Sequence, residues 1–176
     1  MSRRLIAILV GVFVVAVAVY WFGFRQKSVE AGVQVPILVA AIGEGDEAIG
    51  VAGNGAVVRW LPPPEDPPLP RLPLDEVPKG GQVRGTALEQ VRVLAAVPDQ
   101  LRPYVESSYF GESGVDVTLT TGIELRFGDA TQARRKWRAA AAVLADPSVT
   151  SLDYVDLHAP SRPAYEGSDH ELPPAP

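Results

Sequence analysis

The stretch TGIELRFGDATQARRKW, Thr121–Trp137, contains a turn, a strand and the start of a helix in immediate succession. Ile123, Leu125 and Phe127 alternate with polar residues, which is the period-two pattern of a strand with one buried face. This unit predicts that a sheet strand leads directly into a helix packed on that sheet.

The helix after this strand is predicted from its caps and its spacing. Asp129 is a favoured N-cap residue, and Gln132 stands three residues later at the capping-box position. Asp146 and Pro147 end the helix. Its apolar residues recur at helical spacing and form one stripe: Ala133, Trp137, Ala140, Ala141 and Leu144.

Strands are predicted on both sides of this unit. YVESSYF at 104–110 and GVDVTLTT at 114–121 precede it, and SLDYVDLHAP, Ser151–Pro160, follows it. A hairpin followed by strand, helix and strand requires a mixed sheet with helices on one face. The polar, Pro-rich stretch 161–176 predicts a flexible tail.

The N-terminal half of the predicted domain has its own signals. Two apolar runs flank Gly53-Asn54-Gly55, which predicts a hairpin within 48–61. Residues 85–101 predict a second helix, with Thr86 and Glu89 as a capping box. The Pro-rich segment 61–81 is either a polyproline ligand for an aromatic groove or a stiff loop on the domain surface. Its spaced leucines favour the loop.

The first residues predict a membrane anchor. Leu5–Phe24 is twenty residues without a charge, about 30 Å of helix, which matches the hydrocarbon thickness of a bilayer. Its end is aromatic rather than small, so an uncleaved transmembrane helix is favoured over the alternative of a cleaved signal peptide. We expect residues 1–4 to be cytoplasmic, 25–34 to be a stalk, and the domain at 35–160 to be extracytoplasmic.

Charge and composition exclude several classes of function. From Arg25 onward there are 14 basic and 21 acidic residues, which argues against a general nucleic-acid binder. The chain has no cysteine and no Gly-x-Ser-x-Gly elbow. His170, beside Asp169 and Glu171, resembles a metal site only in composition. We therefore predict no catalytic residue, no metal site and no cofactor.

The strand 122–128, the helix centred on Lys136 and the closing segment 153–157 together carry a resemblance. Over 48–163 the chain resembles the extracytoplasmic β domain of the bacterial cell-division proteins FtsQ and DivIB. The implied fold is α+β: an N-terminal single transmembrane helix, then a mixed β-sheet domain with two main helices on one face. Family members carry a POTRA domain before the β domain. Residues 25–42 are too short for one, which leaves open a minimal member, a divergent paralogue or a misplaced gene start.

The resemblance implies a non-enzymatic scaffold in the cell membrane. Its partners would be small coiled-coil membrane proteins of the divisome, which link it to septal wall synthesis. In the family, the last strand and the segment after it receive a partner strand, and here that is about 155–165. Pro160 and Pro163 depart from this pattern because proline cannot donate a ladder hydrogen bond. The candidate partner-binding residues are Val155, Asp156, Leu157, His158, Ser161 and Tyr165.

Two other functions stay open at this stage. A membrane-anchored adaptor would bind its partner through Pro62–Pro64 in the Pro-rich segment. An anchored hydrolase would need a nucleophile next to His158, whose imidazole Asp156 could hold.

Overall fold

The computed structural model describes residues 35–174 of the 176-residue chain. Residues from Pro36 onward form one compact unit. The predicted cytoplasmic tail 1–4, transmembrane helix 5–24 and stalk 25–34 lie outside the described residues. Within 35–174, none of the helices has the length and apolar character needed to span a bilayer.

The first part of the domain is a three-stranded antiparallel sheet in the order β1-β2-β3. A short 3-10 turn joins β1 to β2, and the predicted Gly-Asn-Gly hairpin joins β2 to β3. In that hairpin the Asn54 Oδ1 atom accepts a hydrogen bond of 3.0 Å from the Ala56 N–H. The strands are β1 (Leu38–Ile42), β2 (Ile49–Ala52) and β3 (Val57–Val58).

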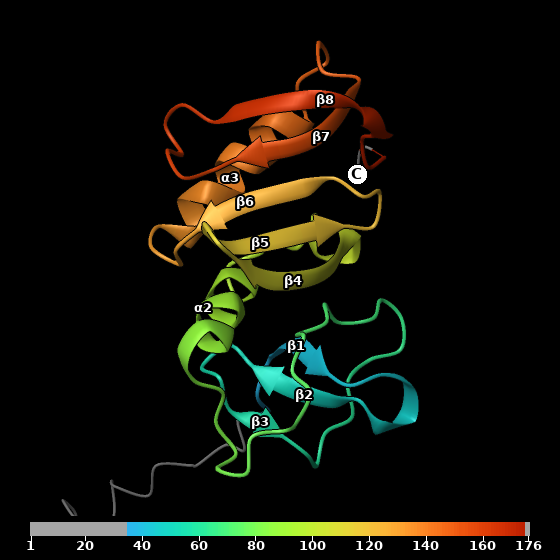
Figure 1. Ribbon diagram of the computed structural model, residues 1–176. Coiled ribbons are helices and arrows are strands. Elements are labelled where there is room, and N and C mark those ends of the chain that lie inside the picture. The colour runs from blue at the N-terminus through green and yellow to red at the C-terminus, as the bar shows by residue number, and fades with distance from the viewer. Residues whose placement is uncertain (1–34, 175–176) are drawn as a thin grey trace, which may run out of the picture. The chain divides into compact units, whose positions relative to one another are not determined.

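The second part is a five-stranded sheet in the order β4-β5-β6-β7-β8 (Figure 1). Only β6 and β7 are parallel, so the sheet is mixed, as the sequence predicts. Its strands are β4 (Val105–Gly111), β5 (Gly114–Leu119), β6 (Glu124–Gly128), β7 (Ser151–Asp156) and β8 (Ala164–Glu171). The helices are α2 (Gly85–Leu94) and α3 (Ala133–Leu144), and α3 forms the crossover between β6 and β7.

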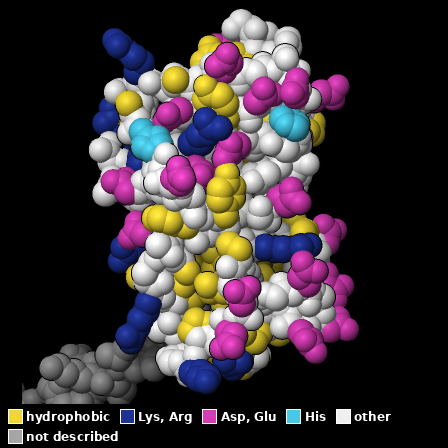
Figure 2. Space-filling view, in the orientation of Figure 1, with side chains coloured by type: hydrophobic (Ala, Val, Ile, Leu, Met, Phe, Trp, Pro, Cys, Tyr) yellow, Lys and Arg dark blue, Asp and Glu magenta, His cyan; other side chains and the backbone are white. Residues whose placement is uncertain are grey.

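The core is formed by one face of the five-stranded sheet, by α2 and α3 and by residues of β1 and β2, and α3 lies behind β6 and β7 in Figure 1. Trp137 of α3 is fully buried, and its ring lies 4.9 Å from that of Phe127 on β6. The Trp137 Nε1–H donates a 2.9 Å hydrogen bond to the Val93 carbonyl of α2. One aromatic side chain thus fixes α3 against both β6 and α2. The opposite face of the sheet has no helix on it and carries charged side chains (Figure 2).

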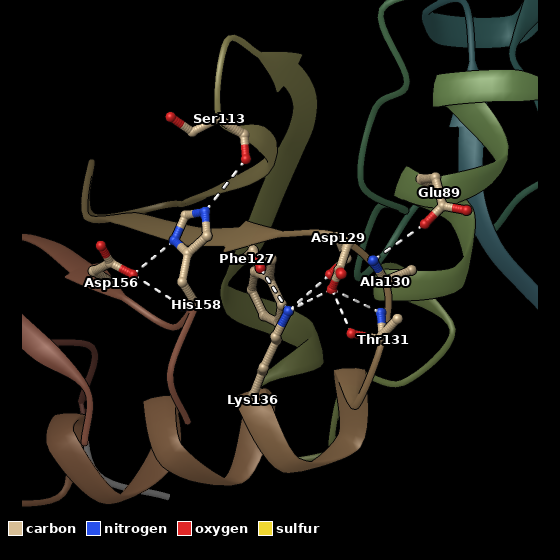
Figure 3. Close-up of polar contacts among 9 residues, drawn as sticks. All are labelled: Glu89, Ser113, Phe127, Asp129, Ala130, Thr131, Lys136, Asp156 and His158. Atoms are coloured by element: carbon tan, nitrogen blue, oxygen red, sulfur yellow. Dashed lines mark hydrogen bonds and ion pairs between the residues drawn. The ribbon is translucent and has the colours of Figure 1, made fainter. Parts of the chain in front are cut away.

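A buried lysine ties the start of α3 to the end of β6 (Figure 3). Lys136 is 4% exposed. Its Nζ donates to the Phe127 carbonyl at 2.8 Å, the Asp129 carbonyl at 3.0 Å and the Asp129 Oδ1 at 2.8 Å. These three oxygens satisfy all three ammonium donors, which is the condition for burying a charged lysine at low cost.

Part of the Pro-rich segment 61–81 packs between the two sheets rather than lying over the surface. The Leu72 side chain is 3% exposed. At Arg71 the backbone bridges β1 and β4: it pairs with Ala41 on one side and with Ser107 on the other. The Arg71 N–H donates to the Glu106 carbonyl at 3.1 Å, and the Ser108 N–H donates to the Arg71 carbonyl.

Both predicted capping boxes are wrong. The helix α2 begins at Gly85 with Arg84 at the N-cap and no side-chain cap. The Glu89 carboxylate instead accepts a 3.1 Å hydrogen bond from the Ala130 N–H, before α3. Asp129 does not open α3 either. The Glu89 carboxylate is thus used in a tertiary hydrogen bond, and the Asp129 carboxylate is used by Thr131 and Lys136.

The true start of α3 lies after a left-handed residue. Gln132 has φ +54° and occupies the N-cap position, and α3 runs from Ala133. The Asp129 Oδ1 accepts bonds from the Thr131 N–H and hydroxyl, which closes a local turn ahead of the helix.

Replacing Lys136 with Met should lower the free energy of unfolding by about 3 kcal/mol, because the buried Phe127 carbonyl loses a charged donor. Urea unfolding of the full chain, followed by tryptophan fluorescence, measures this change. Arg134→Met on the exposed face of α3 is the matched control and should change stability by less than about 0.5 kcal/mol. Equal stabilities of the two variants would show that the Lys136 bonds contribute nothing.

The Asp129–Lys136 pair also predicts acid sensitivity. The hydrogen bond from Lys136, followed by that from Thr131, lowers the pKa of Asp129 to about 2. A lowered folded-state pKa stabilises the fold above the unfolded value of about 3.9, and this contribution is lost as pH falls toward 2. We expect Asp129→Asn to be less stable than the parent at pH 6, with the difference shrinking between about pH 4 and pH 2. Urea midpoints across this range that stay equally far apart would contradict the assignment.

Candidate functional site

The predicted partner-binding strand is an interior strand of the sheet. Val155 and Leu157 are both 0% exposed, so their side chains belong to the core and are not open to a partner in this structure. The strand β7 is paired on both sides. Its β6 side is parallel, with Leu125 opposite Val155, and its β8 side is antiparallel, with Tyr165 opposite Val155.

The edge of the five-stranded sheet is β8, within the stretch predicted to be a flexible tail. That prediction fails for Ala164–Glu171, which form a strand of eight residues. The sequence AYEGSDHE has no apolar alternation, so the pattern that identifies half-buried strands is missing. The strand is specified instead by its backbone pairing with β7, and prolines at 163 and 173 flank it, as suits an edge strand.

A bulge divides β8 in two. The pairing shifts between Leu152 and Tyr154, which are opposite His170 and Glu166. Gly167 lies at the shift with φ +121°, and a Cβ there would lie 2.2 Å from the Asp153 nitrogen. The Asp169 N–H donates a 2.9 Å hydrogen bond to the Asp153 Oδ1.

The far end of β8 also contacts the body of the domain. The His170 ring lies against Gly122 in the β5–β6 turn, where a Cβ would come within 2.7 Å of the ring. Beyond the strand, the Tyr104 hydroxyl donates a 3.3 Å hydrogen bond to the Pro174 carbonyl. The C-terminal strand is therefore anchored at its end as well as along β7.

Asp156 and His158 form a pair at the end of β7 (Figure 3). The Asp156 Oδ1 lies 2.8 Å from the His158 Nδ1 and accepts a 2.9 Å bond from the His158 N–H. The hydrogen bond to Asp156 is the main cause that raises the pKa of His158. Burial acts to raise the pKa of Asp156, but the bonds from His158 outweigh it and lower that pKa.

The remaining predicted residues are exposed. Ser161 lies in the turn between β7 and β8, and Tyr165 on β8 is 45% exposed. The structure therefore brings Asp156, His158, Ser161 and Tyr165 to the surface around the end of β7 and the start of β8.

A second group of polar residues lies on the helix-free face of the same sheet. The Arg126 guanidinium lies 3.9 Å from the centre of the Tyr154 ring and donates to the Glu124 Oε2 at 3.0 and 3.3 Å. The Tyr109 hydroxyl donates to the other Glu124 oxygen. Burial acts to raise the pKa of Glu124, yet the hydrogen bonds from Tyr109 and Arg126 outweigh it and lower that pKa.

The geometry around the histidines gives no support to hydrolysis or metal binding. The His158 Nε2 faces the backbone carbonyl of Ser113 at 3.3 Å, rather than a hydroxyl nucleophile. Within residues 35–174, no group of three or more His, Cys, Asp or Glu side chains is placed to hold a metal ion.

Comparison with known proteins identifies the family. A model of the family "Cell division protein FtsQ/DivIB, C-terminal" matches residues 40–158, more than half of the chain. No curated protein matches the chain. The family match begins within β1 and ends directly after β7, so β8 lies beyond it. The matched range includes the strands up to β7 and both α2 and α3. This chain therefore belongs to the FtsQ/DivIB family of cell-division proteins.

Proposed function

We propose that this chain is a non-catalytic membrane scaffold of the divisome that binds a partner strand along the outer edge of β8. The family match gives the chain a role in cell division. The observation that carries the finer proposal is the sheet order, in which β8 is the terminal strand with β7 on one side only. A terminal strand offers N–H and C=O groups that can pair with an incoming strand.

The composition of β8 supports selective rather than general pairing. All its residues are exposed or partly exposed, so a partner can approach along its length. Glu166, Asp169 and Glu171 place negative charge on it, and the Gly167 bulge interrupts its regular edge. Charges and bulges on an edge disfavour aggregation with unrelated strands. A partner must therefore match both the break at Gly167 and the acidic side chains.

The proposed partners are small coiled-coil membrane proteins of the divisome, and through them the septal wall synthesis machinery. The apolar segment 5–24 would hold the scaffold in the cell membrane, with the N-terminus cytoplasmic and the domain outside. This proposal keeps two of the partner-binding residues predicted from the sequence, Tyr165 on β8 and Ser161 in the exposed turn before it.

Partner binding at the β8 edge can be tested by site-specific crosslinking in the native host, because the chain has no cysteine that would compete for the label. Ser168→Cys places a photoreactive label on β8, and Arg138→Cys places the same label on the exposed side of α3. We expect mid-cell localisation of both tagged full-length variants, and crosslinks to small division membrane proteins from Ser168→Cys only. Equal crosslinking from both positions, or signal spread evenly over the membrane, would overturn the proposal.

Several prolines of the segment 61–81 are exposed, so the alternative of an adaptor that binds its partner through these prolines can be tested. Replacing Pro62, Pro63 and Pro64 together with Ala should leave crosslinking from Ser168→Cys unchanged, because these prolines lie beside the end of β1, in a different sheet from β8. Loss of partner capture in the triple variant, with an unchanged urea midpoint, would favour the adaptor instead.

A further inference from the structure

The helix-free face of the five-stranded sheet, called the open face below, has an excess of carboxylates. The pairing register places two rows of side chains across it. The first row is Tyr109, Asp116, Arg126 and Asp156, and the second is Ser107, Thr118, Glu124, Tyr154 and Glu166. Four carboxylates thus share the face with one guanidinium. Figure 2 shows acidic side chains spread over this view of the sheet.

The one guanidinium is already engaged. Arg126 is bonded to Glu124 and stacked on Tyr154. Asp156 is bonded to His158, and Glu166 accepts a 3.3 Å hydrogen bond from the Tyr154 hydroxyl, so Asp116 is the carboxylate of this face without a side-chain partner within residues 35–174. The arrangement also shows how this surface holds a cation: an aromatic ring supports the guanidinium while a carboxylate accepts its hydrogen bonds.

Asp116 is the residue on this face that most lacks a partner. It is 7% exposed, and its Oδ1 atom has no hydrogen-bond partner among the described residues. Burial, and then the charge of Glu124, raise the pKa of Asp116. A buried carboxylate without a donor is costly to ionise, and a cation beside it would favour its ionised form.

The Asp116 carboxylate packs closely against β4. A Cβ at Gly111 would lie 2.9 Å from the Asp116 Oδ2, so the carboxylate occupies space that a side chain at position 111 would need. Tyr109, 38% exposed, stands opposite Asp116 on β4, so an aromatic ring flanks the site in the same way that Tyr154 flanks Arg126.

We propose that the open face binds a basic segment of a protein partner, whose Lys or Arg side chain contacts Asp116 and lies against Tyr109. Charge complementarity selects this occupant, since four carboxylates share the face with one guanidinium. The surface is separate from the β8 edge: pairing there uses backbone groups, and binding here uses side chains. The two interactions can therefore be removed independently.

The test uses the full-length chain in detergent micelles and two fluorescent ten-residue peptides. One peptide alternates Arg with Ser, and the other alternates Glu with Ser. We expect fluorescence anisotropy to show binding of the basic peptide only, and Asp116→Asn to weaken it by about tenfold. Asp46→Asn, which removes an exposed carboxylate near the turn between β1 and β2, is the matched control and should bind as the parent does.

A second variant and a stability measurement guard against misfolding. Asp156→Asn should weaken binding by about threefold or more, because it removes the neighbouring carboxylate in the same row. Asp116→Asn should not lower the urea midpoint, since the lost carboxylate has an unpartnered oxygen. Equal affinities of Asp116→Asn and Asp46→Asn would overturn the proposal, because binding would then be a general response to acidic charge.

The failure of this proposal can be told apart from failure of strand addition at β8. Coupling a bulky maleimide to Ser168→Cys should block the partner at the edge and leave the basic peptide bound to the open face. Loss of peptide binding on this labelling would place the peptide at β8 and contradict a separate site on the open face.

Discussion

The buried ammonium of Lys136 is the constraint on which the arrangement of the sheet and helices depends. Its three donors bind the last carbonyl groups of the β6 region and the Asp129 carboxylate, so the chain must turn at this point and enter α3. The next residue, Trp137, then lies on Phe127 and bonds to α2. Because a charged lysine is buried at acceptable cost only when all its donors are satisfied, the turn has little freedom to vary. The parallel pairing of β6 with β7 follows, since α3 carries the chain back across the sheet.

With β7 fixed beside β6, the edge of the sheet is decided by what pairs with β7 next. The C-terminal segment takes that position and moves the free edge outward to β8, while the Val155 and Leu157 side chains lie in the core. The Asp153 carboxylate and Gly167 shape the bulge that this pairing needs, and His170 against Gly122 anchors the distal end. The surface available to a partner is thus a polar strand with acidic side chains rather than the apolar strand that precedes it.

The helix-free face gives the same sheet a different chemistry. On one side the side chains form the core under α2 and α3, and on the other they form rows of carboxylates with tyrosines between them. One internal arginine neutralises part of this charge, and Asp116 remains buried with an unpartnered oxygen. The free edge at β8 and the charged face are two separate surfaces of the same sheet, and the two proposed interactions use one each.

The sequence by itself determined the elements whose apolar spacing is strong. The strand Ile123–Phe127, the Trp137 stripe, the Gly-Asn-Gly hairpin and the mixed sheet were all predictable, because period-two and helical patterns record directly which side chains are buried. The family resemblance was visible on the same residues. Only the tertiary structure decided the roles of polar residues. Glu89 accepts a hydrogen bond from Ala130, far along the chain, and Asp129 binds Thr131 and Lys136 instead of capping α3. AYEGSDHE forms a strand although it buries no regular face. Backbone pairing to an existing strand needs no particular side chain, so the sequence of β8 carried no pattern from which the edge could be read.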